Sequence, residues 1–332
     1  MKKTNRLPEQ LEKFGQAINP DSFIELKSLV KNYSSYWLEL KSRTGSVEGK
    51  LHFSKNNRDR LIIFEPGFPG DGSTILEKLW LNKLLENDFD VFAIRHNGTI
   101  INGDFSKNYL SCEEKQTKAK KQQQKVLGSN PPFTIDNWLN EPFIALESLS
   151  PQYKKIYLIG HSFGELSVLY SLIKFTENNK SEANKIKRLI SLAGTTGIIR
   201  GDDDPVLKRW REHIDTNEAR KRIEIGNAVQ NIEFLKNAYN KVHSGIRKTS
   251  EITRLVFVYV FGNDKNTVDE FIYPSEPLDI LKSLDGNGIL VLDKSEKADS
   301  KKGQLAHDMD NLKPSVILNL LCDDLKNKIV II

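Results

Sequence analysis

Short apolar runs, separated by stretches with helical spacing, recur through most of this 332-residue chain. Such runs lie at 61–64, 91–94, 156–159, 189–193, 255–261 and 289–292. Runs of this length and composition predict strands that are buried on both faces. Because these strands alternate with helical patterns, the chain is expected to form a mostly parallel central sheet flanked by helices, which is an α/β fold class.

The beginning of the chain has a different pattern. Residues 36–40 and 46–53 alternate apolar and polar side chains around Arg43-Thr44-Gly45, which predicts an antiparallel hairpin at one edge of the sheet. Residues 1–34 are polar with scattered apolar positions. We expect them to form an N-terminal extension of loose helix and loop.

Two later segments interrupt the alternation of strands and helices. Residues 103–131 are polar and rich in Lys and Gln, which is typical of a solvated surface loop, with an anion-binding arm as the alternative. Residues 198–250 are charged, carry apolar side chains at helical spacing and begin with the helix-start signal Asp204-Pro205. We expect this insertion to be a helical cap or a packed sub-domain, so that 35–197 and 251–332 form the core.

Composition narrows the class of protein. Hydrophobic residues make up 38% of the chain and charged residues 28%, which is typical of a globular protein. A net charge of +5 is too weak to indicate a nucleic-acid partner, and no apolar run is long enough to span a membrane. Lys2 and Lys3 are not followed by the apolar stretch of a signal peptide, and Cys112 and Cys322 form no C-x-x-C pair. A cytoplasmic location is expected, and the oligomeric state stays open, a homodimer included.

The most informative motif is Gly160-His161-Ser162-Phe163-Gly164, a complete G-x-S-x-G. It follows the apolar run that ends at Ile159 and precedes residues with helical spacing. A serine at such a sharp strand-to-helix turn is held in a strained, exposed position, and the glycines relieve crowding there. Ser162 is therefore the candidate nucleophile.

A serine hydroxyl needs a base to take its proton, and the usual base is histidine. His307 lies in a polar loop after the last predicted strand, at the carboxyl edge where sites of open α/β sheets form. It is our candidate base. The other histidines are expected to pack within the elbow (His161), to lie in the hairpin (His52) or in the insertion (His213, His243), or to approach the site rim (His96).

The histidine in turn needs a carboxylate. Asp264 comes directly after the most continuous apolar run of the chain, in the turn Gly262-Asn263-Asp264, and is the first candidate. Asp269 is the alternative. Many aspartates after strands only cap turns, so the order serine, aspartate, histidine carries more weight than either position alone.

The reaction also needs two donors for an oxyanion. One is expected to be the backbone N–H of Phe163, the residue after the nucleophile, and the other the N–H of Phe68 in the loop after the first parallel strand. Pro69 has no N–H, and Gly67 allows a close approach of the backbone. A phosphate-binding loop is disfavoured because neither G-x-G-x-x-G nor a Walker-type lysine is present.

Taken in this order, the motifs resemble those of the α/β-hydrolase superfamily over about residues 35–330. The resemblance implies a sheet of about eight strands, a site at its carboxyl edge, and a lid formed by 198–250. Two features depart from the family pattern: Pro66 stands where the family often has histidine, and Glu165 follows the second glycine of the elbow. The family's acid is also spaced one residue longer, which keeps Asp269 open.

The resemblance implies a serine hydrolase that cleaves an ester or thioester of a small-molecule acyl substrate through an acyl-enzyme, with no cofactor and no metal. A peptidase or amidase on the same fold is the first alternative, since the insertion carries cations that could hold a substrate carboxylate. They are Arg209, Arg211, Arg220, Lys221 and Arg222. A non-catalytic binding protein on the same fold is the second.

Overall fold

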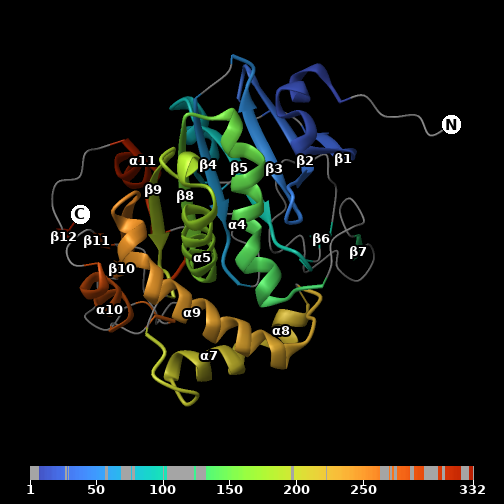
Figure 1. Ribbon diagram of the computed structural model, residues 1–332. Helices are drawn as coiled ribbons and strands as arrows, with labels where there is room; N and C mark the ends of the chain where they lie inside the picture. The colour runs from blue at the N-terminus through green and yellow to red at the C-terminus, as the bar shows by residue number, and fades with distance from the viewer. Residues whose placement is uncertain are drawn as a thin grey trace.

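The computed structural model contains one large sheet with helices on both faces (Figure 1). It describes residues 7–331 except 27, 29, 57–58, 69–75, 77–78, 100, 103–122, 125–131, 196–197, 222, 262–268, 270, 273–274, 285–287, 295–305, 309–310 and 323–328. The predicted segment 103–131 therefore lies outside the described residues, apart from two positions that form a short strand.

Within the described residues the large sheet has ten strands in the order β1-β2-β3-β5-β4-β8-β9-β10-β11-β12. Their bounds are β1 Ile18–Leu26, β2 Tyr33–Lys41, β3 Ser46–Ser54, β4 Arg60–Glu65, β5 Asp90–Arg95, β8 Lys155–His161, β9 Ile186–Leu192, β10 Arg254–Phe261, β11 Gly288–Lys294 and β12 Ile329–Ile331. A separate ribbon pairs β6 (Ile101–Asn102) with β7 (Gln123–Gln124).

All neighbours from β5 to β12 pair in parallel, whereas β1, β2, β3 and β5 pair antiparallel. This confirms the mostly parallel sheet, the antiparallel hairpin and each of the predicted apolar strands. The parallel strands are continuous apolar runs because helices cover both of their faces.

The expectation of loose helix and loop for residues 1–34 holds only in part, because an edge strand also lies there. Part of this segment forms a 3-10 helix, η1 (Glu9–Ala17), and the edge strand β1 (Ile18–Leu26). Pro20 lies in β1, and the register with β2 shifts between Ile18 and Phe23. Proline and irregular pairing are tolerated at a sheet edge, and they hide the strand from a search for regular alternation.

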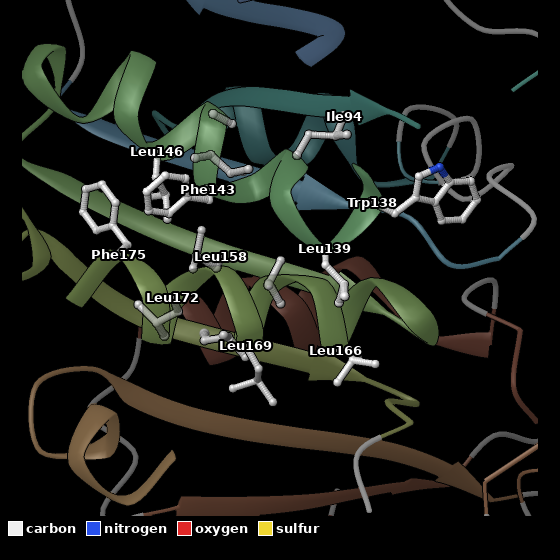
Figure 2. Close-up of a cluster of buried hydrophobic side chains, with 14 of the residues drawn as sticks. Ile94, Trp138, Leu139, Phe143, Leu146, Leu158, Leu166, Leu169, Leu172 and Phe175 are labelled. Carbon is white, nitrogen blue, oxygen red and sulfur yellow. The ribbon is translucent and has the colours of Figure 1, made fainter. Parts of the chain in front are cut away.

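Two apolar cores lie on opposite faces of the sheet. On one face α4 (Ile135–Leu149) and α5 (Phe163–Asn178) bury Phe143, Leu146, Leu166 and Leu172 against the sheet, as Figure 2 shows. The other face is covered by α2 (Leu81–Glu86) and α11 (Pro314–Cys322). The remaining short elements are η2 (Ser150–Gln152), α6 (Lys180–Ala183) and α10 (Ser275–Ser283).

The 198–250 insertion is helical, as its apolar spacing predicts. It contains α7 (Pro205–Ile214), α8 (Asn217–Arg220) and α9 (Ala228–Ser250), which lie together along one end of the sheet (Figure 1). Trp210, Ile214 and Leu235 join the core that contains α4 and α5. Isolated bridges join Thr99 to Ile223 and Phe133 to Ile225, so the insertion packs on the core. In the described part of the chain, no helix combines the length and apolar character needed to cross a bilayer.

Candidate active site

Ser162 occupies a sharp turn between β8 and α5. Its backbone angles are φ 54° and ψ −121°, a conformation that a non-glycine residue adopts only when its surroundings enforce it. Its N–H donates to the carbonyl of Leu192 at 2.9 Å, which ties the turn to the end of β9. A Cβ added at Gly164 would collide with the carbonyl oxygens of Glu65 and Pro66, so only glycine lets the elbow approach the end of β4.

His307 forms a hydrogen-bonded pair with Asp269. The Nδ1 atom of His307 lies 3.0 and 2.9 Å from the two carboxylate oxygens of Asp269. A carboxylate only accepts, so Nδ1 donates and the other ring nitrogen, Nε2, is left without that proton. The Asp269 side chain is itself fixed, because its Oδ1 accepts the backbone N–H groups of Phe271 and Ile272 at 2.9 and 3.0 Å.

His161 links this pair to the elbow. Its Nε2 donates to the backbone carbonyl of His307 at 2.9 Å, and the two imidazole rings lie with centroids 5.1 Å apart. Burial, followed by the charge of His307, lowers the pKa of His161 to about 3. His161 therefore stays neutral near pH 7 and ties His307 to the elbow without adding a positive charge.

The loop after β4 lies against the serine. A Cβ added at Gly67 would be 2.8 Å from the Cβ of Ser162 and 3.0 Å from the carbonyl oxygen of His161, so this contact requires glycine. Phe68 follows, and its ring contacts those of Phe133, Trp138 and Trp210 at centroid distances of 5.7–5.9 Å. Phe163 begins α5, where the first backbone N–H groups of a helix have no partner within the helix.

The structure thus pairs His307 with Asp269 and joins His307 to His161 of the elbow, the residue before Ser162, while Gly67 of the loop that carries Phe68 lies against the serine. Ser162, His307 and Asp269 are each no more than 9% exposed as whole residues. Asp264, our first candidate for the acid, lies outside the described residues. Asp269, the alternative, lies within the described residues with its Oδ2 atom 2.9 Å from Nδ1 of His307.

Sequence reasoning missed a buried group of titratable side chains beneath this loop. His96, expected near the rim, has 0% exposure and lies with Nδ1 2.5 Å from Glu141 Oε2 and 3.4 Å from Glu65 Oε1. Its Nε2 lies 2.7 Å from the carbonyl oxygen of Pro66. Burial and the charge of Glu141 raise the pKa of Glu65 well above its usual range. One feature of the sequence does indicate this cluster: Glu65 is an acidic residue at the end of a buried apolar strand.

Glu65, His96 and Glu141 are also the candidate metal ligands among the described residues, because their ligand atoms lie within 4.8 Å of one another. Ligands of a tetrahedral zinc ion are about 3.3 Å apart, given metal–ligand distances of about 2.0 Å. The separation of 2.5 Å between His96 and Glu141 is too short for two zinc ligands and fits a shared proton.

No family model and no curated protein matches the sequence. Solved structures are similar at low identity. A carboxylesterase from Nitrososphaera gargenis is 13% identical, with 77% of this chain and 89% of that chain covered and a TM-score of 0.45. Acetyl xylan esterase 1 from Thermoanaerobacterium is 13% identical, with 88% of each chain covered and a TM-score of 0.44. Est1E from Butyrivibrio proteoclasticus, solved with ferulic acid, is 16% identical, with 84% and 96% covered and a TM-score of 0.48.

Proposed function

We propose that this chain, which has the α/β-hydrolase fold, is a serine hydrolase that cleaves a carboxylic ester or thioester. The observation that carries the proposal is the serine in a strained strand-to-helix turn, with an Asp–His pair held at the same turn. A hydroxyl at such a turn becomes a nucleophile when an oriented imidazole accepts its proton.

In the first half of the reaction, Oγ of Ser162 attacks the carbonyl carbon of the substrate and its proton passes to Nε2 of His307. Asp269 keeps the imidazole in the tautomer whose Nε2 carries no proton and can accept one, and it stabilises the imidazolium that forms. The N–H groups of Phe163 and Phe68 donate to the oxyanion of the tetrahedral intermediate. The imidazolium then protonates the leaving group, and the acyl group stays on Ser162.

In the second half, His307 takes a proton from water, which attacks the acyl carbon. The second tetrahedral intermediate collapses, Ser162 recovers its proton from His307, and the acid leaves. This sequence uses only groups of the chain and water.

The assignment of the acid goes to Asp269 rather than Asp264. Support comes from the two short distances between its carboxylate and Nδ1 of His307, and from the backbone N–H groups that orient it. An acid that is held in place restricts the imidazole to one orientation, which is what proton transfer from the serine requires.

The aromatic side chains around Phe68 suit an apolar acyl or leaving group. Trp210, on α7 of the insertion, lies with its ring centroid 5.3 Å from that of Phe163 and 5.9 Å from that of Phe68. The insertion therefore contacts both residues that are proposed to supply oxyanion donors, as a cap over the site would.

The peptidase alternative receives less support. Four of the five cations considered for this role already have partners: Arg209 with Glu276, Arg220 with Asp215, Lys221 with Glu218, and Arg211 with the carbonyl of Asp202. Arg222 lies outside the described residues. A substrate carboxylate would have to displace one of these contacts, whereas a neutral ester needs no cation.

Steady-state hydrolysis tests the proposal. We expect turnover of short-chain p-nitrophenyl esters and at most weak turnover of aminoacyl nitroanilides, and we expect Ser162→Ala to lose the esterase activity while its melting temperature stays close to that of the wild type. Preferential cleavage of the anilides would favour the peptidase, and inactivity on every substrate would favour the non-catalytic alternative.

A further inference from the structure

The buried cluster of Glu65, His96 and Glu141 lies directly behind the loop that carries Phe68. Each of the three residues is at most 1% exposed. They come from the end of β4, the end of β5 and the middle of α4, so the fold brings them together from distant positions in the sequence. The proposed mechanism does not use any of them.

Hydrogen bonds fix the orientation of the His96 ring and the proton on its Nε2 atom. The carbonyl of Pro66 can only accept, so Nε2 carries a proton and donates to it. The short contact between Nδ1 and Glu141 also needs a proton between the two atoms, and the other oxygen of Glu141 accepts the N–H of Asn97 at 2.7 Å. The ring is stacked on Trp138 with centroids 3.6 Å apart and planes 5° apart, which blocks movement out of its plane.

The Pro66 carbonyl is thereby held from two sides. His96 donates to it, and the elbow packs against it so closely that a Cβ at Gly164 would be 2.6 Å from its oxygen. The next residue, Gly67, lies against Ser162, and Phe68 follows it. The Pro66 carbonyl and the Gly67 N–H belong to one rigid peptide unit that spans about 3.8 Å, so a rotation of this unit displaces Gly67 and, through its Cα, shifts the next peptide unit, which carries the N–H of Phe68.

We propose that His96 is a positioning residue that sets the oxyanion-binding geometry of the Pro66–Phe68 loop through its hydrogen bond to the Pro66 carbonyl. This inference rests on the proposed function. Glu141 orients the imidazole, Trp138 holds its plane, and Glu65 completes the buried surroundings. His96 is fully buried and does not touch the substrate. It acts through the Pro66–Phe68 loop, so its effect falls on the step in which negative charge develops on the substrate oxygen.

The test compares His96→Gln with His96→Met. Glutamine places an N–H donor near the position of Nε2, whereas methionine has similar length and no donor. His96→Phe, which keeps a ring against Trp138, is a second donor-free variant in case the methionine variant does not fold. His52→Met is the matched control. His52, on β3, is also a buried histidine, and its Nδ1 lies 2.9 Å from the hydroxyl oxygen of Ser35 on β2. It is remote from the elbow in the sequence.

The readout is the inhibition constant of an alkyl trifluoromethyl ketone, together with kcat and KM for a p-nitrophenyl ester. The ketone carbon forms a bond with Oγ of Ser162, the carbonyl π pair becomes an oxyanion, and the serine proton passes to His307, so its binding depends on the oxyanion donors. For the donor-free variants we expect kcat to fall about 10²-fold, since a displacement of about 1 Å costs that much. The inhibition constant should rise by the same factor while KM stays nearly constant, and His96→Gln should recover most of the loss.

A merely structural role gives a different result. Partial unfolding lowers the number of active sites that the inhibitor titrates but leaves its inhibition constant unchanged, as we expect for His52→Met. An unchanged inhibition constant in folded His96→Met or His96→Phe would overturn the inference. The inference would also be overturned if the purified protein contained one equivalent of zinc and a chelator removed both the zinc and the activity. An inert wild-type protein would overturn the proposed function itself, which distinguishes the two failures.

Discussion

The substitution Asp269→Asn separates the role of the triad acid from its role in the fold. Oδ1 of Asp269 accepts the N–H groups of Phe271 and Ile272, and an asparagine carbonyl oxygen can keep both bonds. The new amide NH₂ then faces Nδ1 of His307, where the carboxylate was at 2.9 Å. Because the amide that replaces the nearer oxygen donates, we expect Nδ1 to accept from it and the proton to move to Nε2.

An imidazole with its proton on Nε2 cannot take a proton from Ser162. In a serine triad this wrong tautomer lowers kcat about 10⁴-fold, which corresponds to about 5 kcal/mol of activation free energy. The fold should lose much less, because the hydrogen bonds of the loop survive. We therefore expect a large loss of kcat with a nearly unchanged melting temperature.

The assay is burst and steady-state hydrolysis of a p-nitrophenyl ester at pH 7.5, with Asp264→Asn as the matched control. Asp264→Asn should keep kcat within a few-fold of the wild-type value. The assignment of the acid would be refuted if Asp269→Asn kept its activity while Asp264→Asn lost it. A large drop in melting temperature for Asp269→Asn would instead show that the carboxylate acts mainly on the fold.

Two further substitutions test the contacts of the elbow. Gly67→Ala places a methyl group 2.8 Å from the Cβ of Ser162 and 3.0 Å from a backbone oxygen, so kcat should fall about 10²-fold with little change in KM; an alanine variant with wild-type kcat would contradict this close contact. His161 has a pKa of about 3 in the folded protein against 6.5 in the unfolded chain, so between these values the unfolded chain binds more protons and stability falls as the pH falls. When the pH falls from 7.5 to 5, the free energy of unfolding of the wild type should therefore decrease by up to about 2 kcal/mol more than that of His161→Gln. Urea denaturation at both pH values measures this difference, and equal decreases would contradict the lowered pKa.

The parts of the fold that the sequence predicts are those that depend on local pattern. The runs at 61–64, 156–159 and 255–261 are continuously apolar and are followed by polar or glycine-containing segments, because each lies in the inner part of a sheet that is covered on both faces. The elbow is also local, since its strand, turn and helix are contiguous. Edge strand β1 was missed because it contains Pro20 and a register shift, so burial does not alternate regularly along it.

The parts of the site that the sequence leaves open or misses depend on contacts between distant segments. Asp264 and Asp269 are five residues apart in the sequence, and the contact that favours Asp269 is with His307, 38 residues further along the chain. The location of His96 depends on Glu141, 45 residues away, and on the stacking of its ring on Trp138. A single sequence does not encode these pairings in any local spacing, although polar residues at the ends of apolar strands indicate where to look.

The most direct measurement of the central claim is covalent labelling by a fluorophosphonate, followed by peptide mass spectrometry. Displacement of fluoride by Oγ requires an activated serine, so we predict one adduct per chain, on Ser162, that His307→Ala nearly abolishes. No adduct on the folded protein under conditions that label a control hydrolase, or an adduct on another serine, would contradict the account.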